Sequence, residues 1–287
     1  MNLIAVVTIN RNNNQEVLRL FEELKNQSYK NWMFIVIDDN SSDSSILENI
    51  NDYRFKLFKY PSPFQFAYAK KFNFAYRKAI PYNPKYILKL HTDMIIKSVD
   101  LISLMSDCME NNDNVVSVGP QIFNRNNVKT WGYGIIKERC GHRYSVHECY
   151  MIRTSYLVDH KGFQDEIFTW YGEEMDYFSR IYRKGFKTDQ VSGSIIHYGG
   201  ATSAEFVVKK RYYRAKSTLM FLYKHNKNVS LIQNLKYYYW ENRPEFIAGF
   251  KLLKNLNFKL SFLNFYYLIA GFLSALSLIL IGKIKRI

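Results

Sequence analysis

Acidic side chains gather in one short stretch of the chain. Glu173, Glu174 and Asp176 fall within four positions directly after Gly172, and they open a segment with the pattern of a helix. Carboxylates packed this closely supply what a general base or a cation ligand requires. His197 stands alone downstream, and its imidazole is a further candidate for a base or a cation ligand. The structural alternative is that acidic residues in a first turn only offset the positive end of the helix dipole.

The part of the chain that precedes this stretch must supply its framework. Leu3 to Ile9 is a continuous apolar and β-branched run, which is the pattern of a strand covered on both faces. Apolar residues then recur at helical spacing between positions 17 and 24, and Trp32 to Ile37 is a second apolar run. A strand, a helix and a strand without a tight hairpin predict a parallel, right-handed βαβ unit.

Polar residues follow the predicted strands. Asn10 and Arg11 come after the first strand, and Asp38 to Ser42 come after the second. A later apolar run, Tyr86 to Leu90, leads into His91-Thr92-Asp93 in the same way. Ligands of parallel α/β sheets bind beyond the carboxyl ends of the strands, so we expect a ligand site there.

The remaining elements alternate in the same manner. We predict strands at 55–60, 115–123, 149–152, 186–189 and 194–198, helices at 66–79, 99–111, 153–160 and from 173 to about 184, and a loop or short hairpin at 124–149. The helix at 66–79 carries several cations, some of which could face a diphosphate. A solvated basic face is the more common explanation of such a pattern.

Composition narrows the classes of partner. The chain of 287 residues has 40 Lys and Arg against 25 Asp and Glu, a formal charge of +15, which indicates an anionic partner such as phosphates, a lipid surface or nucleic acid. Its three cysteines, Cys108, Cys140 and Cys149, form no CxxC pair, which argues against a zinc module or a disulfide-stapled secreted domain. The first residues read as a strand rather than a signal peptide, so we expect the main body in the cytoplasm.

Five motifs, taken in order, resemble those of glycosyltransferase family 2. They are Val7-Thr8-Ile9-Asn10-Arg11, the turn from Ile37 to Asp43, the Asp93 loop, Gly162-Phe163-Gln164-Asp165-Glu166 and Gly172-Glu173-Glu174-Met175-Asp176. The resemblance covers about residues 3 to 225 and is greatest to rhamnosyltransferase-like members that build surface polysaccharides. It implies a GT-A fold, a Rossmann-like α/β fold with a mostly parallel central sheet, as a catalytic domain at 1–225. A C-terminal helical region would then occupy 226–287.

The resemblance also implies a site for a sugar nucleotide. Thr8, Asn10 and Asp39 would lie around its nucleoside. The other predicted donor-binding residues are Arg11, Lys70, Asn73, His91 and Thr92.

A divalent cation is implied by the same resemblance. Asp93 matches the last aspartate of the DxD motif, which holds the cation on the donor diphosphate, and His197 matches a histidine that completes the metal site. A lone histidine at a strand end is more often a satisfied structural group, and this is the alternative for His197. His91 stands where the family has the first aspartate, a departure that bears on the strength of metal binding. A carboxylate and waters suit Mg or Mn, and an imidazole favours Mn.

The catalytic base is implied at the acidic stretch. The second acid of the motif is the base in the family, and this position is Glu174, with Glu173 and Asp176 as the other candidates. Inverting transfer requires a carboxylate that removes the proton of the acceptor hydroxyl. Asp176 and Arg180 lie four positions apart on one helix face, a spacing that is also typical of a structural ion pair.

Asp165 and Glu166 are the predicted acceptor-binding residues. The family places residues near the acceptor in their motif. For Asp165, a role in capping the loop is an equally good interpretation.

The end of the chain differs in composition. Residues 209–214 are basic and aromatic, and residues 237–240 add further aromatic side chains. These residue types suit single-stranded nucleic acid or a lipid headgroup surface. Ser261 to Gly282 has no charged residue and is close to the length that spans a bilayer, although a buried or in-plane helix is the alternative. We therefore expect the C-terminal region to attach the protein to the inner face of the cytoplasmic membrane, and we expect no nucleic acid partner.

Together these observations predict an inverting, metal-assisted glycosyltransferase of the hexosyltransferase type. It would move a sugar from a nucleoside diphosphate donor to a lipid-linked or surface glycan acceptor in polysaccharide biosynthesis. Two alternatives remain: a non-catalytic protein of the same fold that binds sugar nucleotides or glycans, and a basic nucleic-acid-binding protein.

Overall fold

A computed structural model describes most of the chain. The described residues are 1–61, 67–124, 126, 137–139, 142–144, 149–197, 204–226, 230, 233–236, 238, 243, 247 and 258–284. Within them the strands are β1 (Ile4–Asn10), β2 (Trp32–Asp38), β3 (Phe55–Lys59), β4 (Tyr86–Lys89), β5 (Met94–Ile96), β6 (Val115–Phe123), β7 (Lys137–Arg139), β8 (His142–Tyr144), β9 (Tyr150–Arg153) and β10 (Lys187–His197). The helices are α1 (Asn14–Lys25), α2 (Ser45–Glu48), α3 (Tyr68–Ala79), α4 (Leu101–Glu110), α5 (Thr154–Asp159), α6 (Glu173–Arg183), α7 (Ala204–His225) and α9 (Phe258–Leu280), with a short 3₁₀ helix at Ile80–Tyr82.

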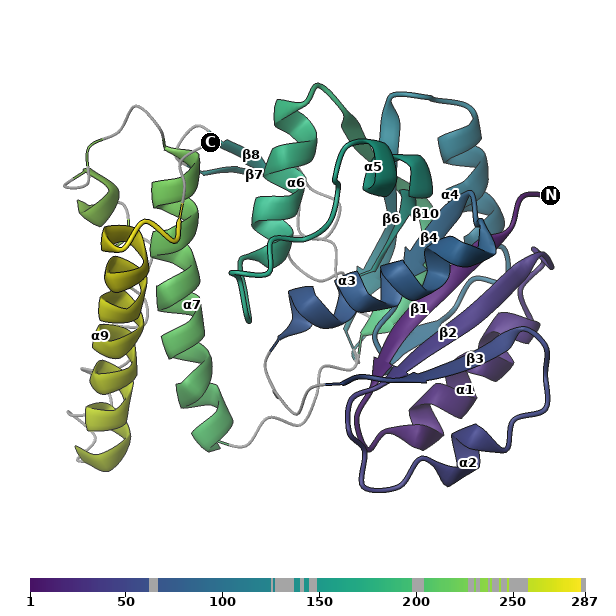
Figure 1. The fold of residues 1–287 in the computed structure, drawn as a ribbon, viewed down its shortest axis with the longest axis horizontal. Helices are drawn as coiled ribbons and strands as arrows, with labels where there is room; N and C mark the ends of the chain where they lie inside the picture. The colour runs from purple at the N-terminus through teal and green to yellow at the C-terminus, as the bar shows by residue number, and fades with distance from the viewer. Residues whose placement is uncertain are drawn as a thin grey trace.

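One sheet organises the described residues (Figure 1). Its order is β3-β2-β1-β4-β9-β6-β10-β5. The four strands from β3 to β4 run parallel, and β6 and β10 also run parallel to each other. β9 and β5 pair with their neighbours in the antiparallel direction. The predicted α/β fold with a mostly parallel sheet is confirmed.

The alternation of side chains along each strand divides the core into two layers. In β1, Ile4 and Val6 face a layer formed with α1, α2 and α4. Ala5 and Val7 face the opposite layer, formed with α3, α5 and α6. Successive residues of a strand point to opposite faces, so a sheet covered on both sides needs a continuous apolar run. This is the reason that Leu3 to Ile9 has no polar alternation.

Helices α7 and α9 lie beside the sheet domain and pack against each other (Figure 1). Their shared core includes Leu219, Phe221, Leu268 and Ala275, and it also takes in Phe168 from the segment ahead of α6. Gly271 permits the close approach, because a Cβ there would lie 2.3 Å from the carbonyl oxygen of Tyr212. No helix within the described parts of the chain combines the length and the apolar character that a membrane crossing requires.

Three details differ from the sequence prediction. The segments at 186–189 and 194–198 belong to one strand, β10, which continues through residues 190–193 and ends at His197. α2 and β5 were not predicted, because elements of four and three residues are too short to show a period. Much of the loop predicted at 124–149 lies outside the described residues, and β7 and β8 within it form an antiparallel pair.

Candidate active site

The carboxyl ends of β1 and β2 are joined by buried polar side chains. Asn10 at the end of β1 donates its Nδ2–H group to Asp38 Oδ1 at 3.2 Å and to Asn14 Oδ1 at 2.8 Å. Its own Oδ1 accepts the backbone N–H of Asn13 at 3.1 Å. Asn10 therefore fixes the two strand ends and the start of α1 in one arrangement. The buried side-chain amide of Asn10 therefore has a positioning role, in addition to the nucleoside contact that was predicted for it.

Asp39 lies in a basic environment at the end of β2. Arg11 Nη1 is 3.4 Å from Asp39 Oδ2, and the buried Lys71 of α3 pairs with the same oxygen. Burial lowers the pKa of Lys71, with Asp39 acting in the opposite direction. Asp39 Oδ1 and the Oγ1 of Thr8 are both buried and have no hydrogen-bond partner among the residues that the structure describes. Buried polar atoms normally have partners, so these two are candidates for contacts with a ligand.

Asp93 and His197 meet at neighbouring strand ends. Asp93 comes just before β5 and His197 ends β10, which pairs with β5, so His197 Nε2 lies 3.1 Å from Asp93 Oδ2. Burial raises the pKa of Asp93, but the hydrogen bond with His197 and the nearby His91 outweigh it, so the net shift is downward. The predicted pair of metal ligands is therefore in contact. Among the described residues, no group of three or more His, Cys, Asp and Glu side chains is placed to hold a metal.

The loop that carries Asp93 is clamped by α1. Arg19 donates to the carbonyl oxygens of Thr92 at 2.9 Å and Met94 at 2.8 Å. Glu23, which pairs with Arg19 at 2.8 Å, accepts the backbone N–H of Ile96 at 2.8 Å. Thr92 is thus held through its backbone. Sequence reasoning missed this clamp, because an i,i+4 pair such as Arg19 and Glu23 is read as an exposed helix pair.

Glu174 pairs with a buried lysine. It lies in the first turn of α6, and its Oε1 accepts a hydrogen bond from Lys89 Nζ at the end of β4. The lysine side chain is 3% exposed and that of Glu174 is 13% exposed. The candidate base is thus a carboxylate that is paired with a buried amine at the edge of the protein interior. Lys89 was not predicted, since it sits within an apolar strand pattern.

Asp176 is surrounded by basic groups and has no exposed surface. Its Oδ2 accepts from Arg180 Nε at 2.8 Å, which confirms the predicted i,i+4 pair. Its Oδ1 accepts from His225 Nε2 at 2.8 Å and pairs with Lys224, both at the end of α7. Burial opposes ionisation, but the His225 hydrogen bond and the cations prevail, so the pKa of Asp176 lies far below its usual range. Its two oxygens are thus occupied by bonds that join α6 to α7.

The predicted acceptor loop is tied to two helices. Asp165 Oδ2 pairs with Lys224 Nζ at 2.6 Å. Glu166 Oε1 accepts from Asn73 Nδ2 at 3.0 Å, and Asn73 also donates to the carbonyl of Gln164 at 2.8 Å. Asn73 is buried and acts on this loop from α3. Lys70, three residues earlier in α3, is exposed.

Gly172 allows α6 to begin beside α7. Its φ is +85°, in the left-handed region that side chains disfavour. A Cβ at this position would also lie 2.9 Å from Ser217 Cβ of α7. Ser217 in turn donates its hydroxyl to the carbonyl of Trp170 at 3.1 Å. The glycine ahead of the acidic stretch is therefore a packing requirement.

Tyr68 brings the candidate residues together and was not predicted. It begins α3, and its ring centroid lies 6.3 Å from that of His91. Burial raises the pKa of Tyr68, and the negative charges of Asp93, Glu173 and Asp39 add to the shift. Carboxylates from three separate segments therefore act on the pKa of one phenol. A tyrosine in an aromatic-rich chain carries no sequence signal for such a position.

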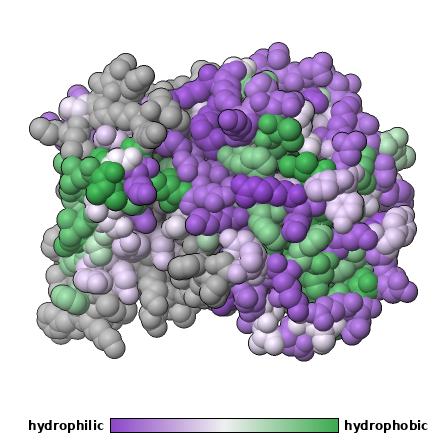
Figure 2. All heavy atoms as spheres, in the orientation of Figure 1, coloured by the Kyte–Doolittle hydropathy of each residue, from purple (hydrophilic) through white to green (hydrophobic). Residues whose placement is uncertain are grey.

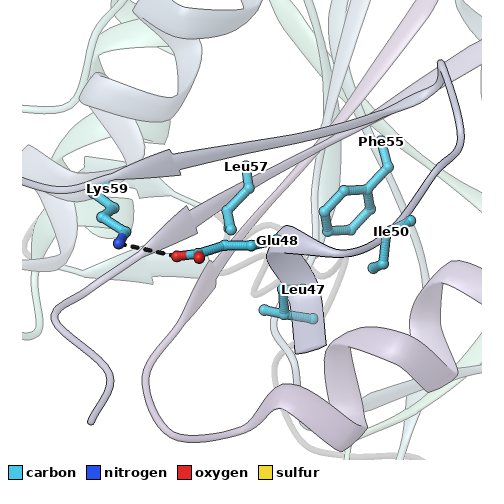
Figure 3. A pocket seen from close by; sticks show the side chains of 6 residues that line it. All are labelled: Leu47, Glu48, Ile50, Phe55, Leu57 and Lys59. Atoms are coloured by element: carbon cyan, nitrogen blue, oxygen red, sulfur yellow. Dashed lines mark ion pairs between the residues drawn. The ribbon is translucent and has the colours of Figure 1, made fainter. Parts of the chain in front are cut away.

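A hollow of about 300 Å³ lies elsewhere, between α2 and β3 (Figure 3). Leu47, Ile50, Phe55 and Leu57 line it, and the ion pair between Glu48 and Lys59, at 2.9 Å, closes one side. None of the predicted site residues lines this hollow. The candidate site is thus defined by its side chains at the strand ends.

Comparison with known proteins identifies the family. Residues 4–178, which are more than half of the chain, match the family model described as glycosyl transferase family 2. The chain belongs to glycosyltransferase family 2. The match contains Asp93 and the acidic stretch Glu173 to Asp176, and it ends within α6. No curated protein matches the chain.

Solved structures of glycosyltransferases are similar to this family 2 chain in fold. TarS from S. aureus in complex with UDP is 15% identical with a TM-score of 0.55, covering 83% of this chain and 70% of its own. TarS in complex with UDP-GlcNAc is 13% identical with a TM-score of 0.58, covering 98% and 92%. The mannosyltransferase PcManGT from Pyrobaculum calidifontis, in complex with GDP-Man and Mn²⁺, is 14% identical with a TM-score of 0.58, covering 95% and 86%. The predicted GT-A-like fold is confirmed, and the family supports a glycosyltransferase role.

Proposed function

We propose that this protein is an inverting glycosyltransferase that takes its sugar from a nucleoside diphosphate donor. The observation that carries the proposal is the arrangement of the family motifs in space. Asp39, Asp93 and Glu173 lie within reach of Tyr68, and Glu174 starts the same helix as Glu173. The ends of β1 and β2 hold the nucleoside, the Asp93 loop faces the diphosphate, and α6 faces the acceptor.

Binding of the donor rests on groups that lack hydrogen-bond partners within the described part of the chain. Thr8 Oγ1 and Asp39 Oδ1 are buried hydrogen-bonding atoms at the strand ends where nucleotides bind in this class of fold. Arg11 and Lys71 hold the other oxygen of Asp39, so its carboxylate is fixed in direction. Because this carboxylate oxygen is fixed in direction, it selects a ligand that places an N–H donor opposite it. A ligand whose donor stays in water is disfavoured.

A divalent cation fits Asp93 and His197. One carboxylate oxygen and one imidazole nitrogen are 3.1 Å apart, and both side chains retain some exposure. An oxygen and nitrogen donor pair suits Mn²⁺, and diphosphate oxygens and waters can fill other positions. When bound, the cation neutralises charge on the leaving diphosphate. His91 takes the place of an acid and packs against Phe72 at 5.3 Å between ring centroids.

Glu174 acts as the general base. Its carboxylate removes the proton of the acceptor hydroxyl while that oxygen forms a bond to the anomeric carbon. The bond from this carbon to the diphosphate breaks on the opposite face, and its electron pair leaves with the nucleoside diphosphate. A position in the first turn of α6 keeps the carboxylate ionised, because the helix dipole is positive there. Asp165 and Glu166 border the acceptor side, where Lys224 and Asn73 orient them.

Calorimetry with nucleoside diphosphates tests the donor half of the proposal. UDP, dTDP, GDP and CDP are titrated into the protein with and without Mn²⁺. We expect a preference for one base that depends on Mn²⁺. Asp93→Asn and His197→Ala should each weaken the Mn²⁺-dependent part by at least about tenfold, the loss that even outer-shell changes cause at metal sites. His160→Ala, at an exposed histidine, is the matched control.

Turnover tests the catalytic half. Release of nucleoside diphosphate from UDP-GlcNAc, GDP-mannose and dTDP-rhamnose is followed with and without a lipid-linked saccharide acceptor. Glu174→Gln should lower the rate by about 10²- to 10⁴-fold, the usual contribution of a general base. Use of dTDP-rhamnose would support the rhamnosyltransferase-like assignment. Nucleotide binding without Glu174-dependent turnover would instead indicate a non-catalytic protein of the same fold.

We further propose that α9 attaches the enzyme to the inner face of the cytoplasmic membrane, beside a lipid-linked or glycan acceptor of polysaccharide biosynthesis. Phe262, Tyr266, Ile269 and Leu273 expose more than half of their surface on α9. Apolar surface gathers over this helix (Figure 2). The other face of α9 packs on α7, so the helix is apolar on both sides. An apolar helix face without charged residues suits the acyl boundary of a lipid surface.

A further inference from the structure

Lys89 occupies a position where a lysine has no packing advantage. It ends β4 between Leu88 and Leu90, and its side chain is 3% exposed. The ammonium group lies over the ring of Phe72 at 4.5 Å and over the ring of Tyr150 at 5.2 Å. An apolar side chain of similar volume would fill this space without the cost of burying a charge.

The surroundings of Lys89 are rigid. Tyr150 is its pairing partner in β9, and the Tyr150 hydroxyl bonds to that of Tyr76 at 2.8 Å. Gln164 donates its Nε2–H to the same Tyr150 hydroxyl at 2.9 Å. Tyr150, one of the two rings beside the lysine ammonium group, therefore belongs to a buried hydrogen-bond network that spans α3, β9 and the acceptor loop. Among the described residues, the ion pair that Lys89 Nζ makes is with an acidic group of α6.

That acidic group is Glu174. Its Oε1 accepts from Lys89 Nζ, and its backbone follows Gly172, whose left-handed φ of +85° fixes how α6 begins. Backbone and carboxylate are therefore held from two sides. A glutamate side chain has three rotatable bonds, so without such a partner its carboxylate would sample many directions. A base must be held close to its productive direction, and a misplacement of about 1 Å costs about 100-fold in rate.

We propose that Lys89 is a positioning residue that orients the carboxylate of Glu174 for proton removal. The inference rests on the proposed function, in which Glu174 is the base. Lys89 acts through Glu174 and contacts neither donor nor acceptor. Its role differs from that of a structural ion pair, because its removal affects the rate of the chemical step and leaves donor binding intact.

The test combines Lys89 and Glu174 variants in one cycle. Lys89→Met, Lys89→Arg, Glu174→Gln and the double variant Lys89→Met with Glu174→Gln are compared with wild type. Release of nucleoside diphosphate from UDP-GlcNAc, GDP-mannose and dTDP-rhamnose by water gives kcat and KM. Lys30→Met, at an exposed lysine outside the site, is the control. Calorimetry of UDP and GDP binding reports whether each variant retains a folded donor site.

We expect Lys89→Met to lower kcat by about 100-fold with unchanged KM, and Lys89→Arg to retain most of the wild-type rate. In the Glu174→Gln background, Lys89→Met should cause no further loss. Two results would overturn the inference about Lys89 and leave the proposed function standing. One is an equal loss of kcat in both backgrounds, and the other is a loss of nucleotide binding that accompanies the loss of kcat. If wild type binds the nucleotides but turns over none of the three donors, the proposed function falls and the inference falls with it.

A melting experiment on the same proteins tests the pair without turnover. Glu174→Gln removes the negative partner of a buried ammonium group, so it should lower Tm. Adding Lys89→Met removes that charge and should restore part of the loss. If the Tm of the double variant lies below the Tm of both single variants, Lys89 does not act by pairing with Glu174.

Discussion

At the scale of single residues, the atoms without partners carry the most information. Thr8 lies near the end of β1 and Asp39 follows β2, and each has one buried oxygen without a hydrogen-bond partner among the described residues. Asp39 is otherwise held by Arg11 and Lys71, so its direction does not depend on a ligand. The sequence indicated Thr8 and Asp39 through the family motifs. It could not reveal Lys71 as the partner of Asp39, because basic residues on a helix look alike until one is buried.

Thr8→Val separates stability from ligand binding. Valine has nearly the shape of threonine and lacks the buried hydroxyl, which has no hydrogen-bond partner in the described ranges of the chain. We expect the free energy of unfolding to rise by up to about 1 kcal/mol, because an unsatisfied polar group costs on this order. Nucleotide affinity should fall by about tenfold, since one hydrogen bond is lost. Urea unfolding and calorimetry check the two effects. A decrease in both the free energy of unfolding and the nucleotide affinity would show that the Thr8 hydroxyl stabilises the fold.

At the scale of elements, the start of α6 depends on a neighbouring helix. Gly172→Ala should lower the free energy of unfolding by at least about 2 kcal/mol, because positive φ and a crowded Cβ both oppose alanine. Gly185 offers a matched control: its φ is +81°, and a Cβ there would meet nothing within 4 Å. Gly185→Ala should therefore cost only about 1 kcal/mol from its backbone conformation. Equal losses in urea unfolding would exclude the contact with Ser217 as the cause.

The cluster around Asp176 predicts a pH dependence of stability. The pKa of Asp176 is lowered from the usual 3.8, because the His225 hydrogen bond, Arg180 and Lys224 favour the charged form more than burial opposes it. A depressed pKa in the folded state stabilises the protein above the unfolded pKa, and this contribution is lost as pH falls below 3.8. Asp176→Asn should lower the free energy of unfolding by about 3 to 5 kcal/mol at pH 7, the cost of breaking a buried pair.

Urea unfolding between pH 3 and 7 checks this expectation. The difference between wild type and Asp176→Asn should narrow as the pH falls, since protonation removes what the substitution removes. Asp107→Asn, at an exposed aspartate of α4, should show little difference at any of these pH values. A gap that stays constant with pH would mean that the charge of Asp176 is not what stabilises the fold.

At the scale of the whole molecule, the order of strands and helices could be predicted and their contacts could not. Continuous apolar runs such as Trp32 to Ile37 mark strands covered on both faces, and these became β1, β2, β4 and β6. The carboxyl ends of those strands placed Asp39 and Asp93 in the site region. Contacts between distant segments, such as Lys89 with Glu174 or Asp176 with His225, leave no period in the sequence. They depend on burial, which only the packed chain defines.

Membrane attachment is tested on the whole protein. Co-sedimentation with vesicles of anionic and neutral lipid measures binding. Leu273→Glu, on the exposed face of α9, should reduce binding to both, because a charge there opposes burial in the acyl boundary. Val99→Glu, at an apolar residue that is 63% exposed in the loop before α4, is the control. Binding that is unchanged by Leu273→Glu and is lost in high salt would assign the attachment to the net charge of +15.

The bonds of Asp176 also bear on how this chain could recombine with its relatives. The family match ends at residue 178, whereas Lys224 and His225, two of the groups that hold Asp176, lie at the end of α7. A chimera that exchanged everything after the match would keep the carboxylate and inherit foreign neighbours for it. Unless those neighbours also offered a cation and an imidazole, Arg180 alone would face the buried charge. A segment exchanged between this chain and its relatives should therefore extend through His225, so that Asp176 keeps its partners.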